Sequence, residues 1–337
     1  MPASIHDVAA LAGVSVATVS RSFTIPEVVR DVTRQSVVAA AAELGYQPNR
    51  AARGLITGRT GNIGVIVPDL GNPYFHAVLK GAQARARRAD YAVFVADGQE
   101  SASEEEALIN AMSKQVDGIV LCSSRLAPGK LAALEATPTV VLLNRRVAGL
   151  PSVIVDSADG MKQAVHHLAS LGHVRGAFVS GPRHSWSNRE RHKGLRAAAL
   201  ECDIEVVTIG PVAPQFESGV GAAERVLEAG VTAVLAYNDL VAVGILSRLA
   251  QLGVTVPDEL SVVGFDDIPL AAMVTPALTT VALPTALAGQ AAVDLLLGRL
   301  ENAGPPTARD LRKLPASLVI RGSTSAPAAV REPAPTR

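Results

Sequence analysis

The chain has 337 residues, and its 31 lysines and arginines balance 31 aspartates and glutamates, so the formal net charge is zero. This length allows two or three domains with a sizeable core. A neutral total does not exclude nucleic acid as a partner, since only the local field at a binding surface matters. The two cysteines, Cys122 and Cys202, lack metal-ligand spacing and suit a reducing compartment. With no signal peptide and no apolar stretch of about 18 residues, we expect a soluble, cytoplasmic protein.

The first residues carry the pattern of two short helices joined by a tight turn. Apolar side chains recur at helical spacing at Ile5, Val8, Ala9 and Ala12. Gly13 then supplies a turn residue without Cβ crowding, and Ser15 can cap a second helix that carries Val19 inward. This arrangement predicts a helix-turn-helix.

In a helix-turn-helix protein the second helix enters the major groove of DNA. Val16 and Ala17 can touch a thymine methyl group, but they cannot read guanine through paired hydrogen bonds. An ordinary αα-corner without a DNA role is the alternative. We expect these residues to face bases and phosphates: Ser15, Val16, Ala17, Thr18, Ser20 and Arg21.

The next segments are a third helix and a short basic stretch. Residues 29–44 place apolar side chains near helical spacing, and Gly45 to Pro48 end the helix. Residues 49–56 are too short to hold a helix alone, so they could fold on contact with DNA. Arg50 and Arg53 could meet phosphates, while Leu55 has no evident core to enter. A basic interdomain linker is the alternative for this stretch.

From Asn62 onward, apolar strands alternate with amphipathic helices, which indicates an α/β fold with parallel sheets covered on both faces. The strands are too many for one sheet, so we expect two doubly wound lobes that hold a ligand beyond the carboxyl ends of their strands. The predicted strands are 63–67, 91–96, 118–121, 139–143, 153–155, 176–179, 206–209, 233–236 and 261–264.

Polar and aromatic residues near the strand ends are candidates for a ligand site. Aromatic rings stack on sugar or base faces, while carboxylates, amides and arginines bond to hydroxyls. Phe216 and Phe265 could instead be plain core, and Asn144 and Asp156 could be caps that orient loops. The candidates are Asp69, Asn144, Asp156, Asn238 and Asp266, with the aromatic residues Tyr74, Phe75, Trp186, Phe216 and Phe265.

Over roughly residues 4 to 321, the chain resembles bacterial transcription regulators of the lactose-repressor (LacI/GalR) family. The resemblance rests on ordered motifs, which include Asp7-Val8-Ala9, Gly13-Val14-Ser15, Thr18-Val19-Ser20-Arg21, Leu44-Gly45-Tyr46-Gln47-Pro48-Asn49, Ala52-Arg53-Gly54-Leu55, Asn72-Pro73-Tyr74-Phe75, Tyr237-Asn238-Asp239 and Val262-Val263-Gly264-Phe265-Asp266-Asp267.

The resemblance implies roles for particular residues. Leu55 matches the leucine of a hinge helix that wedges into the minor groove, and Asn49, Arg50, Ala52 and Arg53 lie on the same segment. Arg191 matches the arginine that binds effector, and the other implied effector contacts are Asp266, Asn238 and the pair Tyr74-Phe75. Asn144 stands where many members carry an aspartate, so one carboxylate contact is missing.

The resemblance also implies the domain organisation: an all-α helix-turn-helix head and two lobes of the periplasmic-binding-protein type, with crossed-over connectivity. The head covers 1–48, the hinge helix and linker 49–60, and the two-lobed core 61–321. Its first lobe takes about 61–157 and 285–321, and its second lobe about 158–284. The Pro- and Ala-rich tail, 322–337, is expected to be disordered.

These observations predict a homodimeric repressor of a sugar operon, released from a palindromic operator by a sugar-like effector bound between the lobes. A co-repressed regulator or an activator that responds to a nucleoside or purine-like ligand is the alternative. A solute-binding protein does not explain residues 1–60. Motifs of serine hydrolases, P-loop enzymes and zinc proteases are missing, so we expect no enzyme and no cofactor. His166, His167 and His173 are expected to bind no metal, because adjacent histidines point to different faces of a helix.

Overall fold

A computed structural model describes residues 3–47, 58–136, 139–302, 307 and 310–328. The chain divides into two compact units, residues 1–61 and residues 62–337. Each is described below by itself.

The first unit is a three-helix head with its own small core. Its helices are α1 (Ile5–Ala12), α2 (Val16–Thr24) and α3 (Asp31–Glu43), with a short 3₁₀ turn, η1 (Pro26–Val28), before α3. The core is made of the buried side chains Val8, Ala9, Val19, Val37, Ala40 and Ala41. Small alanines let three short helices approach closely, so a few side chains suffice to exclude water.

Local capping sets the ends of the first two helices. The Asp7 carboxylate accepts from the backbone N–H and the hydroxyl of Ser4, at 2.8 and 2.7 Å, and these bonds lower its pKa. Gly13 ends α1 with φ of 68°, a left-handed conformation that suits glycine. The Ser15 hydroxyl then accepts from the Thr18 backbone N–H at 3.2 Å and caps α2. The predicted helix-turn-helix geometry is therefore present.

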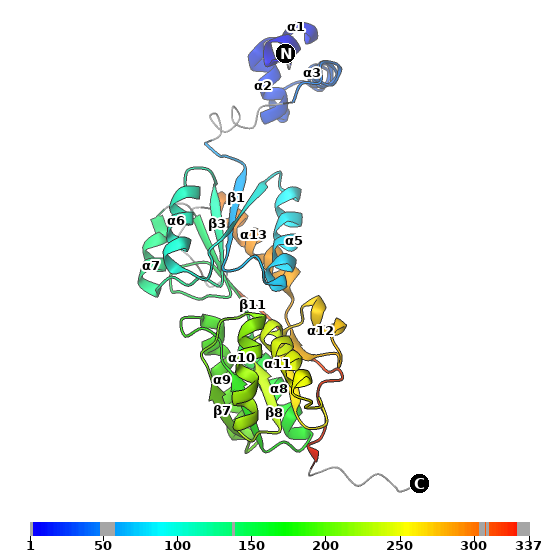
Figure 1. Cartoon of the computed structure of the whole chain (residues 1–337). Helices are drawn as coiled ribbons and strands as arrows, with labels where there is room; N and C mark the ends of the chain where they lie inside the picture. Colours follow the sequence, from blue (N-terminus) through cyan, green and yellow to red (C-terminus); the bar gives the residue numbers. More distant parts are fainter. Residues whose placement is uncertain (1–2, 48–57, 137–138, 303–306, 308–309, 329–337) are drawn as a thin grey trace. The chain divides into compact units, whose positions relative to one another are not determined.

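The second unit contains two six-stranded sheets, one in each lobe (Figure 1). The first lobe has the strand order β11-β5-β4-β3-β1-β2, and all its neighbours are parallel. Its strands are β1 (Asn62–Val67), β2 (Ala92–Asp97), β3 (Gly118–Cys122), β4 (Thr139–Leu143), β5 (Ser152–Val155) and β11 (Leu311–Leu314).

The second lobe repeats this architecture with the order β12-β10-β9-β8-β6-β7, in which only the β12 pairing is antiparallel. Its strands are β6 (Arg175–Val179), β7 (Glu205–Ile209), β8 (Ala233–Ala236), β9 (Ser261–Asp266), β10 (Thr279–Ala282) and β12 (Ser317–Val319). Every strand predicted from the sequence is confirmed, whereas β10, β11 and β12 were missed.

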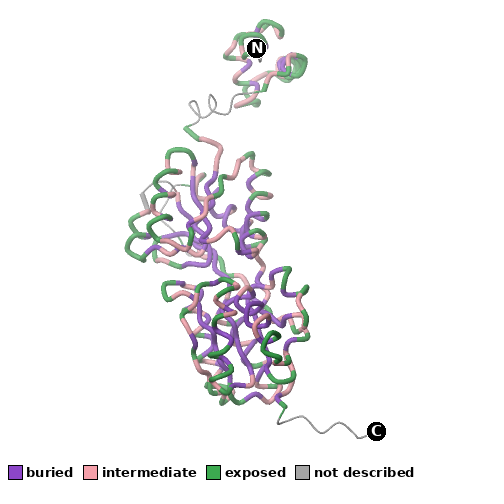
Figure 2. The backbone as a smooth tube through the Cα atoms, viewed as in Figure 1, coloured by how far each residue is buried: buried purple, intermediate pink, exposed green. Residues whose placement is uncertain are grey.

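Helices cover both faces of each sheet and bury its central strands, whereas edge strands such as β2 and β11 stay partly exposed (Figure 2). In the first lobe α5 and α13 lie over one face and α6 and α7 over the other; in the second lobe α8 and α9 lie opposite α10 and α11. These helices, with the short α12, are α5 (Pro73–Arg88), α6 (Ala102–Met112), α7 (Pro128–Ala132), α8 (Ser157–Ser170), α9 (Trp186–Glu201), α10 (Phe216–Glu228), α11 (Asp239–Gln251), α12 (Pro269–Met273) and α13 (Thr285–Glu301).

The chain crosses between the lobes three times: after β5, after β10 and between β11 and β12. The last crossing corrects the predicted boundary, because β12 pairs with β10 in the second lobe although 285–321 was assigned to the first. It also corrects the predicted start of a disordered tail at Gly322. Ser323 is completely buried, and its hydroxyl donates to the Val262 carbonyl at 2.6 Å.

Two histidines help to hold this C-terminal segment. His173 Nε2 donates to the Ser325 carbonyl at 3.0 Å, and His167 Nε2 lies 3.0 Å from the Thr324 hydroxyl. Burial lowers the pKa of both imidazoles. Across the described ranges, no group of three or more His, Cys, Asp or Glu side chains is arranged to hold a metal ion. Among the same residues, no helix is both long and apolar enough to cross a membrane.

Candidate effector and nucleic-acid sites

The predicted DNA-reading residues at the start of α2 differ in exposure. Ser15, Ala17 and Arg21 are exposed, so they are free to meet a partner. Val16 is half-buried and packs against the head core, which leaves only part of its side chain for a base contact. Thr18 and Ser20 are also half-buried, and the Thr18 hydroxyl lies 2.9 Å from that of Ser15. The predicted hinge contacts Asn49, Arg50, Ala52, Arg53 and Leu55 lie outside the described residues.

A cavity in the second unit brings together most of the predicted effector residues. We call it the central cavity. It contains Tyr74, Phe75, Asn144, Arg191, Asn238 and Asp266, which five separate segments of the chain supply. The remaining lining residues are Asn72, Glu100, Ser123, Arg125, Ser187, Pro214 and Tyr237. Both lobes therefore contribute, as expected for the carboxyl ends of facing parallel sheets.

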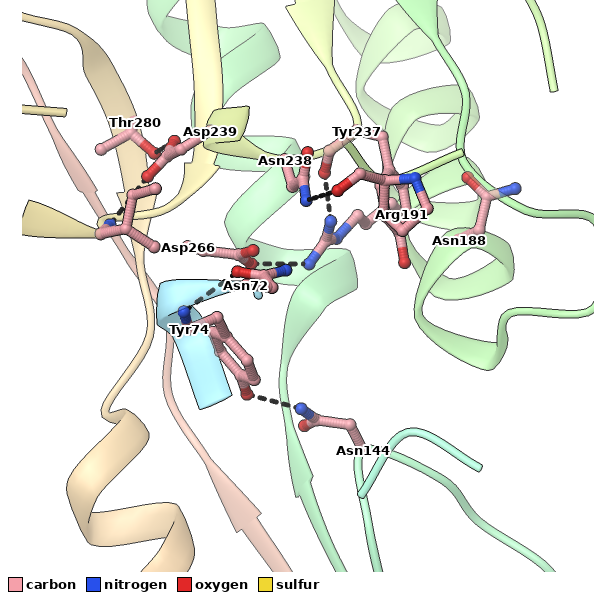
Figure 3. A network of polar contacts seen from close by, with 12 residues as sticks. Asn72, Tyr74, Asn144, Asn188, Arg191, Tyr237, Asn238, Asp239, Asp266 and Thr280 are labelled. Atoms are coloured by element: carbon pink, nitrogen blue, oxygen red, sulfur yellow. Dashed lines mark hydrogen bonds and ion pairs between the residues drawn. The ribbon is translucent and has the colours of Figure 1, made fainter. Parts of the chain in front are cut away.

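Arg191 is held in this cavity by two hydrogen bonds and by the rings of two aromatic residues (Figure 3). Only 4% of it is exposed. Its guanidinium donates to the Tyr237 carbonyl and, at 3.0 Å, to Asp266 Oδ1. Its carbon Cζ lies 3.7 Å from the centre of the Phe265 ring and 4.6 Å from that of Tyr237. These contacts fix the donor fork, and its Nε has no hydrogen-bond partner among the described residues.

Two carboxylates, Asp266 beside Arg191 and Asp239 near Asp266, are deeply buried. Desolvation raises the pKa of Asp266 to about 6, although Arg191 acts in the opposite direction. Desolvation, and then the charge of Asp266, raise the pKa of Asp239 to about 8. The Asp239 oxygens accept from the Thr280 hydroxyl at 2.5 Å and the Ile268 N–H at 2.8 Å. Asp266 alone of the two lines the cavity, and its backbone has φ of 115°, an unusual conformation for a residue with a side chain.

The first lobe supplies an aromatic and amide group. The Asn72 side chain caps α5 by accepting from the Tyr74 N–H at 3.0 Å, which orients the first turn of that helix. The Tyr74 hydroxyl accepts from Asn144 Nδ2 at 2.6 Å, and desolvation raises its pKa. The Tyr74 and Phe75 rings meet edge to face with centroids 5.0 Å apart. This group can stack on a ligand ring and bond to its polar edge.

Five candidate residues do not line the cavity. Two of them follow their alternatives, because Asp156 caps α8 by accepting from the Asp159 N–H at 3.3 Å and Phe265 is part of the core. The other three are Asp69, Trp186 and Phe216. Asp69 closes a turn by accepting from the Gly71 N–H at 2.7 Å. Trp186 begins α9 but is half-buried elsewhere, and the next residue, Ser187, lines the cavity instead. Phe216 packs against the core of the second lobe, which was its alternative reading. Proximity to a strand end was too coarse a criterion for these three.

The sequence reasoning missed Tyr237, Glu100, Ser123 and Arg125. Tyr237 directly follows β8, and Ser123 directly follows β3, so the strand-end criterion could have found both. Glu100 and Ser123 have φ of 56° and 48°, which no sequence pattern indicated. The cavity volume is about 30 Å³, room for one or two water molecules, so a larger ligand requires the lining groups to move apart.

A helix-turn-helix head and a two-lobed α/β unit whose polar cavity lies between the lobes define a ligand-responsive DNA-binding regulator as the class of this protein. Residues 4–49 match the model of the bacterial regulatory proteins of the lacI family, and residues 165–324 match that of the periplasmic binding protein-like domain.

Similar proteins agree with this class over the whole chain. The chain is 33% identical to the HTH-type transcriptional repressor CytR of Escherichia coli K12, over 96% of this chain and 97% of that protein. It superposes on the lac repressor dimer bound to operator and the anti-inducer ONPF with a TM-score of 0.83 and 30% identity, covering 97% and 100% of the two chains. It resembles a complex of the regulator CelR with cellobiose at a TM-score of 0.70 and 30% identity, covering 95% and 99%.

The chain belongs to the LacI family of transcriptional regulators. The relatives are regulators and not enzymes, and the predicted fold of head plus two lobes is confirmed. The protein is thus a DNA-binding transcriptional regulator with an effector-binding domain.

Proposed function

We propose that the protein is a homodimeric repressor whose release from a palindromic operator is controlled by a small, neutral, polyhydroxylated ligand in the central cavity. The observation that carries the proposal is the buried pair of Arg191 and Asp266, which faces Tyr74 and Phe75 in one cavity. Such a repressor acts where the chromosome is, in the cytoplasm. A bound ligand changes the operator affinity only by its differential affinity for the two conformations.

The chemistry of the cavity supports a sugar-like ligand. Arg191 offers donors, Asp266 and Asn238 offer acceptors, and the aromatic rings offer flat apolar faces. Alternating donors and acceptors match the hydroxyls of a sugar, whereas an anionic ligand would meet the Asp266 carboxylate. Similar structures contain cellobiose and, in a regulator from Enterococcus faecium with 25% identity, ribose.

Exposed apolar residues on the first lobe support the dimer. Phe94 and Val95 lie on β2, the edge strand of the first sheet, with 41% and 36% of their surfaces exposed. An edge strand that exposes large apolar side chains is typical of an interface. We propose that a second copy of the chain covers it. Two heads would then meet two half-sites about one helical turn apart, with Leu55 of each hinge wedged into the minor groove.

The experiment compares two arginine variants on the same helix. Arg191→Ala is expected to weaken effector binding more than tenfold, because a lost charge-assisted hydrogen bond costs about 1.5 to 3 kcal/mol. Arg196→Ala removes an exposed arginine from α9 and is the matched control. Ribose, cellobiose and adenosine serve as probes in calorimetry, and a gel shift measures operator affinity.

Arg191→Ala should leave operator affinity close to that of the unmodified protein, so in cells the variant should repress and resist induction. Equal ligand affinity in the two variants would remove Arg191 from the site. If adenosine binds and tightens the operator complex while both sugars fail, the co-repressor alternative replaces the sugar-induced repressor.

A further inference from the structure

A second pocket adjoins the central cavity and shares Arg125 with it. We call it the basic pocket. Its volume is about 610 Å³, much larger than that of the central cavity. The first lobe supplies most of the lining and the second lobe adds two residues before and within α9. The lining residues are Ala102, Ser103, Glu106, Arg125, Leu126, Ala127, Pro128, Lys130, Arg145, His184 and Arg189.

Basic side chains dominate this lining, and part of their charge is already balanced. Lys130 pairs with Glu106 at 2.5 Å. Arg125 forms a two-pronged pair with Glu100, at 2.6 and 2.8 Å. Glu106 is the one carboxylate among the lining residues that the structure describes. Arg145 and Arg189 therefore remain to balance an incoming charge, and Arg189 is exposed.

Arg145 differs from the other basic residues of the pocket, because it is buried and most of its hydrogen-bond donors have no partner among the described residues. Only 3% of it is exposed. One nitrogen, Nη2, donates to the Leu126 carbonyl at 2.9 Å, whereas Nε and Nη1 have no hydrogen-bond partner in the described part of the chain. Desolvation and the nearby Arg189 lower its pKa. A buried donor without a partner costs free energy, and more so when it is charged.

The nearest buried carboxylate does not satisfy Arg145. Glu105 accepts from the Arg125 backbone N–H at 2.8 Å through Oε2, and its Oε1 has no partner among the described residues. No ion pair within 4.0 Å joins Glu105 to Arg145 in the described ranges. Desolvation raises the pKa of Glu105.

We propose that the basic pocket binds a phosphate group, with Arg145 as its central donor and Arg189 at its rim. Guanidinium groups match tetrahedral oxyanions because their fixed donor forks can contact two oxygens at once. The phosphate comes either from free inorganic phosphate or from a phosphorylated ligand that also enters the central cavity past Arg125. The pocket is large enough for either source. Binding of free phosphate is independent of the proposed function, whereas a ligand that spans both sites rests on it, because its sugar part would occupy the central cavity.

The first experiment measures binding of inorganic phosphate to the full-length protein, without sugar or DNA, by calorimetry and thermal shift. Phosphate should raise the melting temperature. Arg145→Lys, which keeps the charge but loses the fork, should weaken phosphate binding about tenfold, and Arg189→Gln about threefold. Arg146→Gln is the matched control, because Arg146 is an exposed neighbour outside the lining.

A similar loss in Arg146→Gln, or no loss in Arg189→Gln and Arg145→Lys, would overturn the proposal. Should Arg145→Lys fail to fold, Arg189→Gln decides the matter alone, since its side chain is exposed.

The second experiment separates the two sources with ribose 5-phosphate, ribose and inorganic phosphate. Tighter binding of ribose 5-phosphate than of the other two, lost in Arg189→Gln, assigns the phosphate to a ligand that spans both sites. Equal binding of ribose 5-phosphate and inorganic phosphate would identify free inorganic phosphate as the ligand of the basic pocket. If neither binds with a dissociation constant below about 10 mM, the basic pocket is not a phosphate site.

Discussion

Arg191 shows how a binding group is oriented before a ligand arrives. The Tyr237 carbonyl and Asp266 hold two of its nitrogens, and the rings of Phe265 and Tyr237 hold its plane. The Ser185 hydroxyl caps α9 by accepting from the Asn188 N–H, and it also contacts the Tyr237 hydroxyl at 3.1 Å. The start of the helix that carries Arg191 therefore also positions Tyr237. When a ligand binds to Arg191, the arginine side chain then loses little conformational entropy.

The buried Asp239 makes stability fall as the pH rises from about 4 to about 8. Its pKa is about 8 in the folded protein and about 3.8 when unfolded, so the folded state binds the extra proton between these values. The resulting stability is complete below pH 3.8 and is lost as the pH rises through 8. We expect the free energy of unfolding to fall by at most about 1.4 kcal/mol per pH unit between these two pKa values, and to level off above pH 8, where Asp239 is ionised in both states.

Asp239→Asn provides the control for this prediction. The amide can still accept from the Ile268 N–H, and the Thr280 hydroxyl can turn to accept from it. The variant should therefore match the unmodified protein at about pH 4 and exceed it by a margin that grows up to about pH 8 in urea unfolding. The same loss between about pH 4 and about pH 8 in both proteins would assign the slope to other groups.

Individual site residues were predictable where a motif specified them, and less so elsewhere. Arg191, Asn238 and Asp266 follow from the family resemblance, and all three line the central cavity. Trp186 was selected because aromatic residues are rare in this chain, yet the helical turn directs Ser187 to the cavity instead. Rarity does not determine side-chain direction, which depends on where a helix starts.

At the scale of elements, the helix pairs that flank the sheets cross where small residues allow close contact. In the pair α10 and α11, a Cβ atom added to Gly219 would lie 2.1 Å from the Val241 carbonyl oxygen, and one added to Gly244 would lie 2.1 Å from that of Phe216. Backbone atoms cannot move aside as flexible side chains can. The helices must therefore separate if either glycine gains a side chain.

Two glycines on α10 offer a matched pair of substitutions. Gly219→Ala should destabilise the protein by about 1 to 3 kcal/mol, because the methyl group overlaps α11. Gly221→Ala meets no atom within 4 Å and should stabilise it by about 0.5 to 1 kcal/mol through helix propensity. Urea unfolding measures both. Equal effects of the two substitutions would show that close helix contact does not matter here.

The elements missed from the sequence are short strands at or near a sheet edge. Leu311–Leu314 reads Leu-Arg-Lys-Leu, and its two central residues are exposed, so the strand lacks the apolar run used to recognise buried parallel strands. Ser317–Val319 has only three residues. Both form because a neighbouring strand offers free backbone groups, which is a tertiary effect that local pattern cannot report.

For the whole molecule, DNA binding should depend steeply on salt. If Arg21, Arg50 and Arg53 of each head contact phosphates in a dimer, six contacts predict that log affinity falls against log salt concentration with a slope of about −5. Gel shifts on a palindromic operator at several salt concentrations measure this slope. A slope near about −2, or a footprint without dyad symmetry, would contradict the dimeric mode of binding.

The rhythm of strands and helices predicted two lobes, because each buried strand is followed by a helix that must cover it. The lobe to which the last segment, residues 317–328, belongs could not be predicted in this way. Ser323 reaches Val262 and Thr279 through hydrogen bonds of 2.6 and 2.8 Å, and residues 261–264 and 279–282 lie far from it in sequence. A Pro- and Ala-rich composition gave no indication of such long-range bonds.

The three crossings between the lobes also set the order of events during translation. The first sheet needs β11 and the second needs β12, and the ribosome makes both strands only near the end of synthesis. The head has its own core within the first 47 residues, so it can fold while the remainder is still being made. At typical elongation rates, the ribosome needs some tens of seconds to make the residues that follow the head. Nascent chains would thus carry a finished DNA reader before they can sense any ligand.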